Sequence, residues 1–128
     1  MIAEADMMNV LVAACPSFEL RWRALIQEWQ DDPEGLHPYV ALAEYSEHLQ
    51  SLLERGDTGS FPEVFQAIER LQVDGAPKVR EAATIGILEG LQNAKDPSLF
   101  CPYLGLESAK WWDKLNRFWN GETDALRE

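Results

Sequence analysis

The chain has 128 residues, a length that corresponds to one domain of ordinary size. With 22 acidic and 11 basic residues its net charge is -11, which disfavours nucleic acid and anionic membrane surfaces as partners. A hydrophobic fraction of 46% is typical of a globular protein, and no apolar run approaches the roughly 20 residues that span a bilayer.

Two helices are predicted before the first acidic break. Residues 3–14 have helical apolar spacing, and this helix must end by Cys15, because a residue that precedes proline avoids helical backbone angles. Ser17 is placed to cap a second helix that runs to about residue 29. We expect one face of this second helix to be a buried stripe of Phe18, Trp22, Leu25, Ile26 and Trp29.

Glycine and proline delimit the two central helices. A third helix runs from residue 37 or 38 to residue 55, and Gly56 suits the left-handed position that ends many helices. Ser60 and Glu63 then form a capping-box pattern, in which each residue would bond the backbone of the other. This pattern predicts a fourth helix that ends at residues 74–75.

The last third of the chain continues in the same way. Pro77 opens a fifth helix that extends to about residue 92, and residues 96–105 form a short helical turn. The final helix is predicted from about Leu106 to Trp119, with Gly121 as its stop. We expect the polar residues 122–128 to form a frayed tail.

These elements define the fold class. No stretch alternates with the period of two that marks a strand, and β-branched residues are scarce. We therefore predict an all-α fold, a single-domain bundle of six or seven short helices with antiparallel neighbours. The domain is expected to span residues 1–121, followed by the tail at 122–128.

The N-terminus and the cysteines bear on the compartment. Glu4 and Asp6 occupy positions where an export signal carries basic residues, so we expect a cytoplasmic protein. Cys15 and Cys101 are too few for a disulfide framework, and we expect both thiols to be reduced and buried.

Residues 61–92 carry a local resemblance. Two amphipathic helices are separated by Asp74-Gly75-Ala76-Pro77 and followed by Val79-Arg80. This pattern resembles a single HEAT-type repeat, in which an aspartate in the turn precedes a Val-Arg pair. The resemblance implies a HEAT-like helical hairpin and a protein-binding scaffold, although a solenoid needs about three stacked units and one is clear here.

A second resemblance extends over most of the chain. It resembles a family of small acidic bacterial proteins of unknown function in Cys15-Pro16-Ser17-Phe18, Gly56-Asp57 before Phe61-Pro62, residues 88–93, Tyr103-Leu104-Gly105 and residues 111–119. The resemblance implies no known chemistry. Such proteins are similar in size and charge to immunity proteins of toxin systems, an analogy of build rather than of motif.

Residues with catalytic potential are sparse. Glu44 lies one helical turn before His48, so the pair could share a metal ion, but His37 lies across a turn and no third ligand is evident. No His-Glu-x-x-His, Cys-x-x-Cys or Gly-x-Ser-x-Gly motif occurs. We therefore predict no catalytic residue, no metal and no other cofactor. A metal-dependent enzyme around Glu44 and His48 is the least favoured interpretation.

Charge is concentrated in the N-terminal half. Residues 1–60 hold 11 acids and 3 bases, whereas residues 61–128 hold 11 acids and 8 bases. Such a surface attracts a cationic partner, although solubility alone accounts for it equally well. Tryptophan is common in interface hot spots, but burial is the simpler explanation of the tryptophans in the last helix. The predicted partner-binding residues are Glu28, Asp31, Asp32, Glu34, Glu44, Glu47, Trp111 and Trp119.

The leading hypothesis is a non-enzymatic protein that binds a basic protein through an acidic face. In its most specific form it is an immunity protein that neutralises a basic bacterial toxin. The alternative is a HEAT-like scaffold whose partner lies along residues 61–92. The sequence does not set the oligomeric state.

Overall fold

The computed structural model describes residues 1–127 and confirms the all-helical class. Within that range the chain forms seven α-helices, and its one β-type contact is an isolated bridge between Ile2 and Gly75. The α-helices are α1 Glu4–Ala14, α2 Glu19–Trp29, α3 Pro38–Glu54, α4 Phe61–Asp74, α5 Pro77–Ala82, α6 Glu89–Leu91 and α7 Leu106–Trp119. Between and after them lie the 3-10 turns η1 Pro16–Phe18, η3 Pro97–Tyr103 and η4 Ala125–Arg127, and the π-helical segment η2 Ala83–Leu88.

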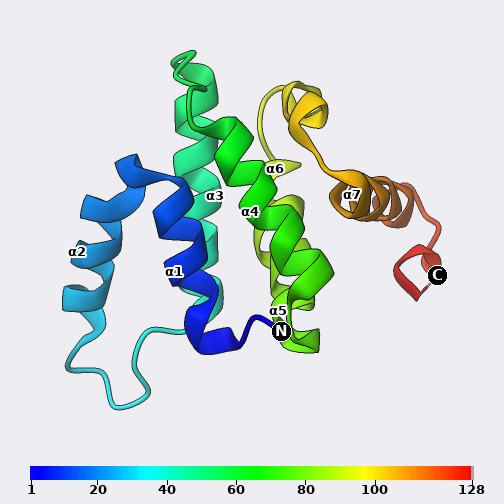
Figure 1. Cartoon of the computed structure of the whole chain (residues 1–128). Coiled ribbons are helices and arrows are strands. Elements are labelled where there is room, and N and C mark those ends of the chain that lie inside the picture. The colour runs from blue at the N-terminus through cyan, green and yellow to red at the C-terminus, as the bar shows by residue number, and fades with distance from the viewer. Residues whose placement is uncertain (128) are drawn as a thin grey trace.

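The helices pack around one helical hairpin, with α2 and α7 at the sides. Helix α4 runs antiparallel to the continuous helical stretch α5–η2–α6, as the resemblance to a HEAT repeat implied. Helix α1 packs on α4, and α3 packs on η2 and α6, so α1 and α3 cover this hairpin together. Figure 1 shows α2 at one edge of the molecule and α7 at the opposite edge.

Glycine allows the closest of these helix contacts. A Cβ atom at Gly86 would lie 2.6 Å from Leu42 Cδ1, and one at Gly90 would lie 2.6 Å from Ser46 Oγ. Both distances are shorter than carbon or oxygen atoms tolerate, so only glycine lets η2 and α6 approach α3 this closely.

The core is rich in aromatic rings from distant parts of the chain. Phe61 and Phe65 of α4 pack against Phe100 and Tyr103 of η3, with ring centroids 5.2–6.0 Å apart. Tyr45 is fully buried, and its hydroxyl donates a 2.8 Å hydrogen bond to the Leu11 carbonyl. This bond satisfies the phenol inside the core and ties α3 to α1.

Helix ends confirm the glycine predictions but not the serine caps. Gly56 and Gly121 have φ angles of 70° and 104°, the left-handed conformations expected after a helix. The Ser17 hydroxyl bonds His48 Nε2 at 2.8 Å instead of capping α2. Ser60 Oγ likewise makes no cap and lies 3.9 Å from Cys15 Sγ. Both capping predictions are wrong, because tertiary contacts take up the hydroxyl groups.

Three burial predictions are also wrong. Ile26 is 47% exposed, so the predicted stripe on α2 is only partly buried. Cys101 is exposed, whereas Cys15 is buried as expected. The tail does not fray over residues 122–127, because Ala125 is 1% exposed and Leu126 packs against the core. Glu128 lies outside the described residues.

Candidate protein-binding face

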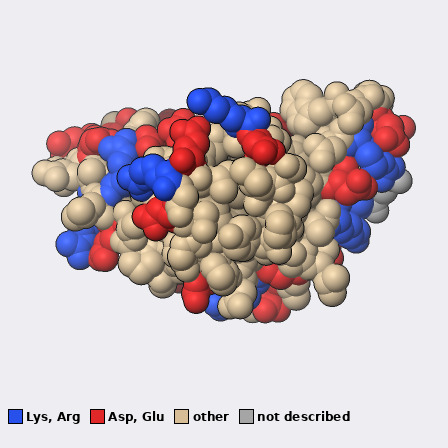
Figure 2. All heavy atoms as spheres, turned by 90° about the horizontal axis from the view of Figure 1, so that it is seen from above, with Lys and Arg blue, Asp and Glu red and all other residues tan. Residues whose placement is uncertain are grey.

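One arginine forms ion pairs with two of the predicted partner-binding acids. Arg21 of α2 bonds both carboxylate oxygens of Glu44, at 3.0 Å from Nε and 2.7 Å from Nη2, and its Nη1 lies 3.0 Å from Glu28 Oε1. This pairing holds the pKa of Glu44 below its ordinary value. At the edge of Figure 2 where α2 lies, acidic and basic side chains adjoin, while the middle of that face is uncharged. Glu28 and Glu44 are therefore occupied within the protein.

Three other predicted acids lie on the loop between α2 and α3. Asp31, Asp32 and Glu34 are exposed, and the Asp32 carboxylate accepts a 2.9 Å hydrogen bond from the Glu34 backbone N–H. Among residues 1–127 no ion pair involves these three side chains. The loop is therefore a local concentration of negative charge.

Glu47 lies about one helical turn after Glu44 on α3 but has different surroundings. It lines a pocket of about 400 Å³ between α3 and α6, to which Ile85 and Glu89 also contribute. Glu89 and Asn93 line a neighbouring pocket of about 270 Å³ as well, and there they meet Trp119. The structure therefore brings the predicted acid Glu47 and the predicted aromatic Trp119 onto one continuous surface.

The exposed ridge of α5–η2–α6 extends this surface. Glu81, Ile85 and Glu89 follow one another at helical spacing, and Ile85 separates the α3–α6 pocket from a larger pocket beside α7. We call this surface the α6 face, made of Glu47, Glu81, Ile85, Glu89 and Trp119. Over the described part of the chain, none of its three carboxylates takes part in an ion pair.

The negative field of this region is evident at Tyr39. Tyr39 lines the α3–α6 pocket and a further one that includes Glu4 and Glu81. Burial raises the pKa of the Tyr39 phenol, and the carboxylates of Glu81 and Glu4 raise it further. Acids that are far apart in the sequence thus act together on this side of the molecule.

The two predicted tryptophans occupy different surroundings. Trp119 is 62% exposed and packs edge-on against Phe118 with ring centroids 5.2 Å apart. Trp111 is half-buried in the pocket between α5–η2 and α7, and its indole N–H donates to Glu107 Oε1 at 3.2 Å. Lys114 Nζ lies 4.4 Å from the centroid of the Trp111 ring. Trp119 therefore belongs to the α6 face, and Trp111 belongs to its neighbouring pocket.

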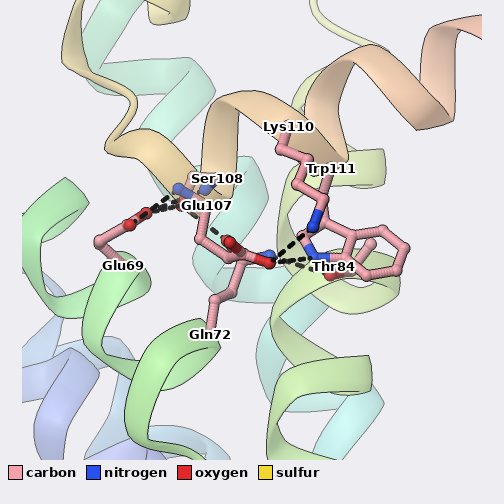
Figure 3. A network of polar contacts seen from close by, with 7 residues as sticks. All are labelled: Glu69, Gln72, Thr84, Glu107, Ser108, Lys110 and Trp111. Carbon is pink, nitrogen blue, oxygen red and sulfur yellow. Dashed lines mark hydrogen bonds and ion pairs between the residues drawn. The ribbon is translucent and has the colours of Figure 1, made fainter. Parts of the chain in front are cut away.

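A partly buried polar network, which the sequence did not predict, fixes α7 to α4 and η2 (Figure 3). The Glu69 carboxylate of α4 accepts hydrogen bonds of 2.9 Å from the backbone N–H groups of Glu107 and Ser108. Ser108 Oγ lies 2.7 Å from Gln72 Oε1, and Gln72 Nε2 donates to Thr84 Oγ1 at 2.9 Å. No spacing in the sequence signals this network, because Gln72 and Ser108 are 36 residues apart.

Glu44 and His48 do not form the pair that a metal site requires. Glu44 is bound to Arg21, and His48 bonds Ser17 instead. Burial lowers the pKa of His48, and Arg55 lowers it further, while Asp57 opposes both effects. Within residues 1–127, no three His, Cys, Asp or Glu side chains gather where they could hold a metal ion.

These features define an all-α protein built around a helical hairpin, with a hollowed acidic face. The chain belongs to the family described as a domain of unknown function, DUF7674, whose model matches residues 8–120. The expected membership in a family of unknown function is thereby confirmed. No curated protein and no solved structure matches the chain. None of the helices in the described residues is both long and apolar enough to cross a membrane.

Proposed function

We propose that this protein binds a basic protein through the α6 face and does not catalyse a reaction. The supporting observation is that Glu47, Glu81 and Glu89, which are free of ion pairs in the described residues, flank pockets lined by Ile85 and Trp119. Apolar and aromatic side chains in pockets contribute most of the affinity of protein interfaces, and complementary charge adds specificity and association rate.

The other predicted acids have a different role in this proposal. Glu28 and Glu44 would have to release Arg21 before they bound a partner, so we do not assign them direct contacts. Asp31, Asp32 and Glu34 contribute to the net charge of -11, which accelerates the approach of a cation over distances up to about a Debye length.

The more specific form of the proposal is an immunity protein of a bacterial cytoplasm that covers a basic toxin. The alternative is a scaffold, which the stacking of α1, α4 and α7 supports, because α1 and α7 both pack on α4 in the manner of successive repeats. The two roles differ in outcome. An immunity protein abolishes the activity of its partner, whereas a scaffold leaves that activity intact.

Charge reversal with a matched control tests the proposal. In the test variant Glu47, Glu81 and Glu89 become lysine, and in the control Asp31, Asp32 and Glu34 become lysine, so both change the net charge equally. Each protein is used as bait in cytosol from the source cells, and captured basic proteins are compared. We expect the test variant to lose its partner and the control to keep it.

Association kinetics give a second readout. With the captured partner, the association rate of the unchanged protein should fall by roughly tenfold or more as salt rises to physiological levels. Equal capture by both variants would remove the α6 face from the proposal. A rate that did not change with salt would remove electrostatic attraction.

A further inference from the structure

The pocket between α5–η2 and α7 differs from the acidic pockets of the α6 face. It has a volume of about 490 Å³, within the range of typical ligand sites. Its walls are largely apolar and come from Pro77, Ile85, Trp111 and Leu126. It therefore offers an aromatic and aliphatic lining directly beside the carboxylates of the α6 face.

The polar groups at its base are already bonded to one another. Gln72 and Thr84 line the pocket, yet the Gln72 amide bonds both Thr84 and Ser108. Over residues 1–127, every buried side-chain nitrogen and oxygen has a hydrogen-bond partner. The base is thus held in shape without leaving a buried donor or acceptor for a polar ligand, and an apolar group can be desolvated there at least cost.

The charges at the rim are unequal in their availability. Arg80 Nε donates to the Gly75 carbonyl at 2.9 Å, and Glu107 Oε1 accepts from Trp111 and lies 3.7 Å from Lys110 Nζ. Glu81 has no ion pair among the described residues, and Glu89 lies beyond Ile85 along the same ridge. Arg80 keeps its positive charge, but the carboxylates of Glu81 and Glu89 follow one another on the side of the pocket that adjoins the α6 face.

The backbone is also unusual at this point. Thr84 at the base and Ile85 at the rim both belong to the π-helical segment η2. Such segments are rare, and they occur frequently at functional sites because they redirect side chains that a regular α-helix would place elsewhere.

We propose that this pocket binds a large apolar side chain of the basic partner, with lysine or arginine residues on either side of it contacting Glu81 and Glu89. The inference rests on the proposed function and specifies the partner segment: an apolar anchor flanked by basic residues. Trp111 and Ile85 enclose the anchor, and the carboxylates of the ridge fix the direction in which the segment lies.

Four matched peptides test the inference. Each has a central Phe or Ala flanked on both sides by either Lys or Glu residues, and each is titrated into the full chain while amide and indole NMR signals are followed. We expect the Phe–Lys peptide to bind about tenfold or more tightly than the Ala–Lys peptide, as a buried interface anchor does. The largest shifts should occur at Thr84, Ile85 and the Trp111 indole.

A pair of isoleucine variants locates the binding. Ile85→Ala removes a wall of the pocket, and Ile26→Ala changes the same residue type on α2, where it lines none of the described pockets. We expect the Phe–Lys peptide to bind severalfold more weakly to the first variant and normally to the second.

The outcomes separate this inference from the proposed function. Equal binding of Phe–Lys and Ala–Lys would contradict the proposal that the pocket binds an apolar anchor. It would not contradict the proposal that the α6 face binds a basic partner. Equal binding of Phe–Lys and Phe–Glu would instead overturn the proposed preference for a basic partner. An absence of saturable binding by every peptide, or shifts confined to other regions, would overturn the pocket assignment.

Discussion

Helices α2 and α7 lie at opposite edges of the molecule (Figure 1). They are attached to the other helices by different kinds of interaction. Helix α7 buries Trp112 and Leu115 and shares the network of Glu69 and Ser108 with α4. Within α2 itself Leu25 alone is buried, and the helix reaches α3 through the partly exposed ion pair of Arg21 and Glu44. Buried hydrogen bonds resist solvent, whereas exposed ion pairs are screened by salt and contribute little to stability.

This difference shows how one acidic composition produces two kinds of surface. On the α2 side an arginine meets two carboxylates and offsets part of their charge. Near α7 the carboxylate of Glu69 caps the N-terminus of that helix, and the carboxylates of the α6 face form no ion pair among residues 1–127. The position of a few basic residues, rather than the number of acids, determines which carboxylates stay unpaired among residues 1–127.

Truncation of the cores of the two helices should give the largest effects. Leu115→Ala in α7 is expected to lower the free energy of unfolding by about 2–5 kcal/mol, because it leaves a cavity in the shared core. Leu25→Ala in α2 should lower the free energy of unfolding by less, since α2 can separate locally while the other helices stay folded. Urea unfolding measures the stability of both variants. The control is Leu106→Ala, which should change stability little because Leu106 is 93% exposed. Equal losses for Leu115 and Leu25 would mean that α2 is as integral as α7.

Removal of the carboxylate that caps the N-terminus of α7 should have the next largest effect. Glu69→Ala leaves the backbone N–H groups of Glu107 and Ser108 without their acceptor, which costs about 1–3 kcal/mol. Glu69→Gln keeps one oxygen acceptor and should recover part of the loss. Glu63→Ala, an exposed change on the same helix, is the control in the same urea experiment. A Glu69→Ala variant as stable as this control would show that the network is dispensable.

The sequence predicted most of the fold because helix ends are encoded locally. The bounds of α7 follow from Leu106, Trp119 and Gly121, each of which acts through its own neighbours in the chain. The caps at Ser17 and Ser60 were wrong for the opposite reason, since His48 and Cys15 contact those hydroxyls across the fold. The π-helical segment η2 was also missed, because it packs against α3 and carries no local signal.

The candidate site was less predictable because it depends on pairings between helices. Charge density in the sequence indicated Glu44 and Glu47 alike, yet Glu44 binds Arg21 of α2 whereas Glu47 lines the pocket between α3 and α6. Only the position of Arg21 distinguishes them, and nothing within 20 residues of Glu44 reveals that contact. Glu81 and Glu89 lie in the less acidic half of the chain, and they were therefore not predicted as partner-binding residues.

Breaking the ion pair of α2 should have a smaller and local effect. Arg21→Met keeps the aliphatic stem but removes the contacts to Glu28 and Glu44, so amide hydrogen exchange should accelerate in α2 and stay unchanged in α7. Arg23→Met, which breaks a pair within α2 only, is the matched control. If both variants changed exchange equally, the link between α2 and α3 would not depend on Arg21.

The same pair predicts a dependence on acid. Because Arg21 lowers the folded-state pKa of Glu44, its stabilisation is fully present above the ordinary value of 4.5 and is lost as the pH falls through the lowered value. Urea unfolding over this acidic range should therefore show a shallower pH dependence in Arg21→Met than in the unchanged protein. An identical dependence in the two proteins would contradict the contact.

His48 should give the smallest effect, and it tests the hydrogen bond on the α2 side. Burial lowers its pKa in the folded state below the ordinary 6.5, so the unfolded chain takes up the proton first as the pH falls. Stability should thus be highest above pH 6.5 and decline from there down to the folded-state pKa, below which this contribution is constant. His48→Gln should flatten the profile in that window, while Ser17→Ala, which keeps the imidazole, should preserve a slope. If stability declined equally steeply in His48→Gln, another group would cause the decline. The partly buried imidazole of His48 would then have no part in the pH response of this edge of the molecule.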